Sequence, residues 1–269
     1  MKFTLNLMAE LEDALKSGAP EQRVQLLRRI TDLFLSESNR LNEEQVSVFD
    51  DILVHLAHRI EERVLAQLSW KLAPVGNAPM NMIKCLAEDD NISVARPVLE
   101  QSTRISEHDL IEIAKHKSQA HLFAIAGREQ LGVALTDVLV GRGDVRVASK
   151  LARNAGARFS SAGFAVLVKR ADGDDGMTES LSKRTDIPQN IFRELLLRAT
   201  NLVRSRLLAS ATPENQQQIQ DAMKSVAEEL DLSADADADA DPTDAEGAAQ
   251  GVKSKRYFLG PRSSLRAVK

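Results

Sequence analysis

The sequence is poor in the residues on which disulfide-stabilised and β-rich folds depend. Its one cysteine, Cys85, cannot form a disulfide within the chain, so stability must come from packing. The 269 residues include only 13 glycines and 8 prolines, few for the many tight turns of an all-β fold. Aromatic residues make up 4% of the chain, and Leu and Ala dominate the 43% that is hydrophobic, which favours packed helices. The composition therefore predicts an all-α chain.

Long apolar runs are also missing. No stretch approaches the roughly 18 apolar residues that a membrane-spanning helix needs. The N-terminal segment acquires acids at Glu10, Glu12 and Asp13, and it lacks the apolar run and cleavage site of a secretory signal. We therefore expect a cytoplasmic protein with no membrane span.

The chain has no excess of positive charge. It carries 35 Lys and Arg against 39 Asp and Glu, for a net charge of −4 and a pI near 5.8. Because nucleic-acid binding depends on neutralising phosphates, this balance argues against nucleic acid as the main partner. A local basic patch would override that argument.

What the sequence does have is a repeated helical pattern. Apolar residues at three- and four-residue spacing predict helices over residues 22–35, 43–60 and 61–73. Asn42 followed by Gln45 is typical of a capping box at the start of the second helix. After the third helix, we expect Asn77 to cap the next helix and Pro79 to lie in its first turn.

Further along, shorter helical segments recur with a common period. Residues 94–99, 121–126 and 147–152 align with spacings of 27 and 26 residues. A second set of segments, aligned on Ile113, Leu139 and Leu167, has spacings of 26 and 28 residues. Two sets of helices with one period are typical of stacked helix pairs, in which short helices are stabilised by their neighbours. We predict an α-α superhelix of HEAT-like short helical repeats.

The array should extend beyond these three copies. Residues 186–210 are interpreted as a later, longer copy with Asp186 as its cap and Pro188 in its first turn. Residues 213–230 are expected to form a closing helix that starts at a Thr212 cap.

The composition changes abruptly after this helix. The segment SADADADAD starts an acidic stretch that has no large apolar residues to stabilise a fold. The last residues carry six Lys and Arg and no acid. We predict a helical repeat domain over 1–231, an acidic disordered linker over 232–250 and a basic tail over 251–269.

The middle of the chain resembles a known family. The resemblance rests on the order and spacing of residues 92–110 (ISVARPVLEQSTRISEHDL), 118–126 (SQAHLFAIA), 136–144 (TDVLVGRGD) and 154–170 (NAGARFSSAGFAVLVKR). These segments resemble the alphaproteobacterial domain of unknown function 2336, over roughly residues 40–205. The resemblance implies a HEAT-like α-superhelix and a bacterial origin, and it implies no reaction.

One serine–histidine pair invites a catalytic interpretation. Ser118, Gln119 and His121 open a repeat helix. A serine nucleophile also needs an orienting acid and oxyanion donors, and the G-x-S-x-G elbow is absent. We therefore expect Ser118 to act as a helix N-cap and His121 to be a surface or capping histidine.

The other possible sites also favour structural roles. His55 and His58 lack a third metal ligand, and Asp172–Gly176 departs from the calcium-loop pattern at its fifth position. Arg142-Gly143-Asp144 indicates a helix end followed by the Asp144 cap of the next helix. The sequence has no Walker A loop and no dinucleotide fingerprint. We expect no metal, no cofactor and no catalytic residue.

The basic tail has the features of a partner-binding segment. Its cations surround Tyr257, Phe258 and Leu259, a combination that could suit a partner groove, an anionic surface or RNA. A solvated tail near the acidic linker is the alternative. The candidate partner-binding residues are Ser118, Gln119, His121, Arg142, Asp144, Tyr257, Phe258 and Leu259.

These observations favour a non-catalytic scaffold or regulatory adaptor that binds another protein, whose identity and stoichiometry the sequence leaves open. The alternative is a HEAT-like nucleic-acid-binding protein or DNA glycosylase-like enzyme, which should line one face with Lys and Arg. Many of the cations between residues 96 and 170 fall at expected helix C-termini, where they complement the helix dipole.

Overall fold

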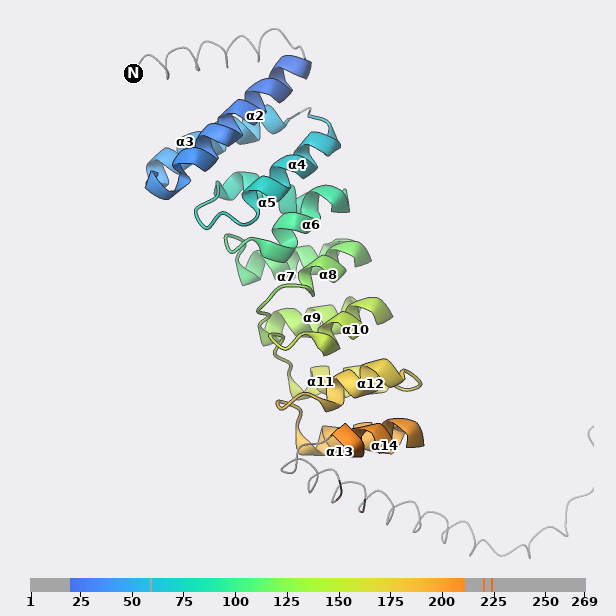
Figure 1. Cartoon of the computed structure of the whole chain (residues 1–269). Helices are drawn as coiled ribbons and strands as arrows, with labels where there is room; N and C mark the ends of the chain where they lie inside the picture. Colours follow the sequence, from blue (N-terminus) through green and yellow to red (C-terminus); the bar gives the residue numbers. More distant parts are fainter. Residues whose placement is uncertain (1–19, 59, 211–219, 221–223, 225–269) are drawn as a thin grey trace, which may run out of the picture. The chain divides into compact units, whose positions relative to one another are not determined.

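The computed structural model describes residues 20–58, 60–210, 220 and 224, and in these residues the chain is all-helical (Figure 1). The predicted all-α class is confirmed. The elements are α2 (Pro20–Glu37), η1 (Ser38–Arg40), α3 (Glu43–Ala57), α4 (Glu62–Leu72), α5 (Met80–Glu88), α6 (Ile92–Gln101), α7 (Glu107–His116), α8 (Gln119–Ile125), α9 (Val133–Arg142), α10 (Val145–Arg153), α11 (Ser161–Arg170), α12 (Asp175–Ser182), α13 (Gln189–Arg198) and α14 (Asn201–Ser210).

The helices pack in chain order (Figure 1). Even-numbered helices from α2 to α14 each pack on the next even-numbered helix. The odd-numbered helices α7, α9, α11 and α13 do the same, and α3 packs on α5. Each main contact joins helices at most two positions apart, which is the arrangement of a helical repeat array. The predicted superhelical form of the array stays a prediction.

A continuous apolar core connects these layers. It extends from Leu26 in α2 to Leu195 in α13 and consists mainly of Leu, Ala, Val and Ile. A smaller cluster follows, formed by Leu196, Ala199, Val203 and Leu207. Because each helix has only seven to eighteen residues, this shared core supplies the stability that short helices lack alone.

Side-chain caps repeat along the array. The cap residues accept a hydrogen bond from a backbone N–H two or three residues later, at Asn42, Asn91, Ser106, Asp144, Ser160 and Asp174. The capping box at Asn42 and the cap at Asp144 are confirmed. Such caps satisfy N–H groups that have no partner within their own helix.

The predicted cap at Asn77 is wrong. The Asn77 amide donates to the carbonyl of Ser38, and Pro79 occupies the N-cap position of α5. The buried carboxylate of Asp50, from α3, accepts from the N–H groups of Asn81 and Met82 at 2.8 Å each. A side chain 31 residues away thus caps α5, and local sequence gives no sign of it.

The structure also corrects the end of the array. Residues 186–210 contain two helices, α13 and α14, separated at Ala199 and Thr200. Asp186 does not cap α13, because its carboxylate pairs with Arg184 and Pro188 holds the N-cap position. Helix α12 was not predicted, and its cap is Asp174, from the Asp172–Gly176 segment that departs from the calcium-loop pattern.

Several predictions concern residues outside the described part of the chain. They are the closing helix over 213–230 with its Thr212 cap, of which only residues 220 and 224 are described and are helical, together with the domain boundary at 231, the acidic linker and the basic tail.

Two loops are joined by backbone hydrogen bonds between neighbouring repeats. Leu131 N–H donates to the Gly156 carbonyl at 3.1 Å, and Arg158 N–H donates to the Leu131 carbonyl at 3.0 Å. A Cβ atom on Gly156 would lie 1.7 Å from the Glu129 carbonyl oxygen, so only glycine fits there. The bridge fixes the loop before α9 to the loop before α11.

We predict that Gly156→Ala destabilises the protein by about 2 kcal/mol, because the new methyl group must push the two loops apart. Gly141→Ala is the matched control, since a Cβ there meets nothing within 4 Å and alanine favours the helix. Urea denaturation followed by circular dichroism measures both variants. Equal stability of the two variants would contradict this account of the bridge.

Candidate binding surfaces

The serine–histidine pair is built into the array. His121 is buried, with 1% of its surface exposed. One ring nitrogen, Nε2, lies 2.9 Å from the Asp89 carbonyl oxygen, and Nδ1 lies 2.8 Å from Ser118 Oγ. A carbonyl can only accept, so Nε2 carries a hydrogen, and in the neutral ring Nδ1 then accepts from the Ser118 hydroxyl. The ring therefore connects the start of α8 to the end of α5.

This geometry corrects two expectations. His121 is a core residue and not a surface or capping histidine, because its ring fills the junction between repeats. Ser118 holds the N-cap position of α8, but its hydroxyl bonds to the imidazole and not to a helix N–H. The sequence suggested a side-chain cap because serine is common at N-cap positions, whereas in the structure the Ser118 hydroxyl is bonded to Nδ1 of His121.

Three other candidate residues meet at the next junction. Gln119 Nε2 donates to the Arg142 carbonyl at 2.9 Å, and its Oε1 accepts from the Asp144 N–H at 2.8 Å. The Arg142 side chain donates to the Ala114 carbonyl. Gln119 and Asp144 also line a small hollow of about 200 Å³ beside Phe123. These residues join repeats, and their contact with a partner stays a prediction.

The remaining candidates are placed as follows. Tyr257, Phe258 and Leu259 lie outside the described residues. His55 and His58 are exposed, and the described residues hold no group of three side chains suited to a metal ion. Among the described helices, none is long and apolar enough to cross a membrane.

Several arginine side chains of the array bind backbone carbonyl groups of the preceding repeat. Arg128 donates to the carbonyls of Leu99 and Ser102, and burial lowers the pKa of its guanidinium. Arg170 donates to the carbonyls of Gly141 and Gly143, at the end of α9. Cations at helix ends thus do more than complement the dipole of their own helix, because they bind the preceding repeat.

An open groove of about 870 Å³ lies where the repeats of α9 to α12 meet, and we call it the α10–α12 groove. The ends of α10 and α12 and the loops that follow them supply most of its lining. The lining residues are Gln130, Val133, Ala152, Arg153, Ala155, Gly156, Ala157, Arg158, Phe159, Ser180, Lys183, Arg184, Thr185 and Asp186.

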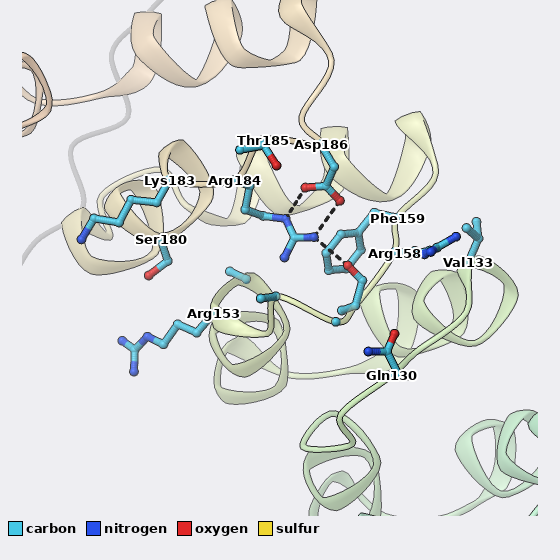
Figure 2. Close-up of a pocket in the computed structure, with 14 residues that line it drawn as sticks. Gln130, Val133, Arg153, Arg158, Phe159, Ser180, Lys183, Arg184, Thr185 and Asp186 are labelled. Atoms are coloured by element: carbon cyan, nitrogen blue, oxygen red, sulfur yellow. Dashed lines mark hydrogen bonds and ion pairs between the residues drawn. The ribbon is translucent and has the colours of Figure 1, made fainter. Parts of the chain in front are cut away.

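Arg184 holds the centre of this groove together (Figure 2). Its guanidinium donates to the carbonyls of Asn154 and Ala157 at 2.7 and 2.6 Å, and it binds both carboxylate oxygens of Asp186. It also lies 4.9 Å from the centre of the Phe159 ring. With 7% of its side chain exposed, Arg184 has its donors occupied within the array.

Three further cations line the groove without such partners. Figure 2 shows Arg153 and Lys183 on one side of the Arg184–Asp186 pair and Arg158 on the other, near Val133. None of the three side chains has a hydrogen bond or ion pair within the described residues. The groove therefore offers positive charge that is available to a ligand.

Sequence reasoning did not find this groove. Arg153 and Arg158 belong only to the general supply of cations between residues 96 and 170, and no sequence pattern singles out Lys183. The one local signal is the pair Arg184 and Asp186, two residues apart, which a loop can bring into bidentate contact.

Comparison with known proteins gives one family match. The family model described as an uncharacterised protein conserved in bacteria (DUF2336) matches residues 94–259. No curated protein and no solved structure matches the chain. The resemblance found in the sequence covered roughly residues 40–205. The family match starts later, at residue 94, and extends further, through the acidic segment into the basic tail. The whole α10–α12 groove lies within it.

We predict that Arg184→Ala destabilises the protein by about 3 kcal/mol, because it leaves two carbonyls and the Asp186 carboxylate without their donor. Arg198→Ala is the control, since Arg198 pairs with Asp172 and Glu194 at a site where 37% of its side chain is exposed. That change should cost at most about 1 kcal/mol. Chemical denaturation of both variants checks the difference, and similar losses would show that Arg184 has no special role.

Proposed function

We propose that this chain, which belongs to the DUF2336 family of uncharacterised proteins conserved in bacteria, is a non-catalytic scaffold that binds a partner protein. The observation that carries the proposal is the α10–α12 groove, where Arg153, Arg158 and Lys183 remain unpaired within the described residues. A repeat array presents such a surface on short helices fixed by their neighbours.

The polar network around α8 supports a structural role for the one pair that suggested catalysis. Both ring nitrogens of His121 are engaged, one by Ser118 and one by the Asp89 carbonyl. A catalytic imidazole must instead reach the substrate to exchange a proton with it, and His121 is only 1% exposed. Here the histidine holds two helices together.

A nucleic-acid-binding function is the second candidate, and the three unpaired cations favour it. Phosphates are ordinary ligands of Arg and Lys. A DNA glycosylase-like activity has less support, because Asp186 is the one carboxylate among the lining residues and Arg184 already binds both of its oxygens. The net charge of −4 also favours a protein partner.

Site-specific photo-crosslinking in the native bacterium tests the proposal. A benzoylphenylalanine at Val133, which is 40% exposed on the groove, should crosslink to a discrete partner protein. The matched control is Val48, which is 55% exposed on α3 and does not line the groove. The same adducts at both positions, or nucleic acid in place of protein at Val133, would contradict the proposal.

A further inference from the structure

We propose that the α10–α12 groove binds an extended acidic segment of the partner protein, with carboxylates that reach both sides of the groove. This inference rests on the proposed function and specifies the chemistry of the ligand. It starts from the charges: the lining holds four cations and one carboxylate, although the whole chain has a net charge of −4.

Of the four cations in the lining, one is already paired and three are available to a ligand. Arg184 is neutralised by Asp186 and is engaged with the carbonyls of Asn154 and Ala157. Arg153, Arg158 and Lys183 are therefore the cations that can bind a ligand. Each can form a charge-assisted hydrogen bond with a carboxylate, which is stronger than a bond between neutral groups.

The placement of the three cations favours an extended chain. Arg153 and Lys183 lie on one side of the central pair and Arg158 on the other (Figure 2). An extended peptide directs successive side chains to opposite sides. A segment lying along the groove could thus place carboxylates against both sides at once.

The uncharged part of the lining suits apolar side chains better than bases. Val133 is partly exposed and Ala155 is exposed, so the groove offers small apolar contacts. Phe159 is the one aromatic residue in the lining, and Arg184 stacks on its ring. Single-stranded nucleic acid binds through exposed aromatic faces as well as cations, and the one aromatic ring of this groove is already stacked with Arg184.

The central carboxylate also disfavours a phosphate backbone. Asp186 is 45% exposed, and because Arg184 balances its charge, this part of the lining offers no net positive charge to phosphates that follow one another along a strand. A peptide can place an uncharged residue opposite this pair. The expected ligand is a segment with pairs of adjacent Asp or Glu residues, whose side chains point to opposite sides, separated by uncharged residues, at least one of them apolar.

Fluorescence anisotropy with the full chain tests the inference. The probe is a fluorescein-labelled ten-residue peptide in which one Glu-Glu pair lies on each side of a central Leu and Ser fills the other positions. At low salt the protein should bind it at least tenfold more tightly than the same peptide with Gln in place of Glu. Replacing Arg153, Arg158 and Lys183 together by Gln should weaken binding at least tenfold.

The matched control replaces three cations that do not line the groove, Arg63, Arg96 and Lys169, by Gln. It removes the same charge and should change affinity less than twofold. Both triple variants should keep the wild-type helical circular dichroism, because their side chains are exposed.

Three results would overturn the inference: no binding of the Glu peptide, equal loss in the two triple variants, or tighter binding of a ten-nucleotide single strand than of the peptide. The first two leave the scaffold proposal standing if the Val133 crosslink captures a specific protein. Loss of that crosslink as well would refute both, and tight binding of the nucleotide strand would favour the nucleic-acid alternative.

Discussion

The structure depends on one constraint: short helices end inside the array, and the carbonyl groups at their C-termini need donors. The last carbonyls of a helix have no partner in that helix. Here the donors come from the next repeat. Arg128, Arg142, Arg170 and Arg184 reach back 26 to 30 residues to carbonyls at the ends of α6, α7, α9 and α10. Polar contacts and the shared apolar core therefore connect the same neighbours.

This constraint explains why some cations bind backbone carbonyls within the array while others remain available to a ligand. A guanidinium that binds backbone carbonyls at a junction is fixed and desolvated, as at Arg128 and Arg184. Cations at the same helix ends that find no carbonyl remain available, as at Arg153 and Lys183. The α10–α12 groove forms where both kinds meet, so the residues that shape it and the residues proposed to bind a ligand are different.

Much of the fold could be predicted from the sequence, because helical periodicity and caps such as Asn42 and Asp144 are local signals. The shared spacing of the repeats further predicted which helices are equivalent. Two of the failures have one cause: the deciding partner is far away in sequence. Asp50 caps α5 from 31 residues away, and His121 is buried against Asp89, 32 residues away. The groove was missed for the same reason, since Arg184 is fixed by the carbonyls of Asn154 and Ala157, 30 and 27 residues away.

Hydrogen exchange of Arg128→Met, compared with the unchanged chain, tests the central claim most directly. If junction arginines stabilise only neighbouring repeats, exchange should accelerate in the last turn of α6 and in α8, where Arg128 connects the two. Amides of α2, α3, α13 and α14 should exchange at unchanged rates, because stability in a repeat array is shared between nearest neighbours. Uniform acceleration over all described helices, or no change around α6 and α8, would contradict the account.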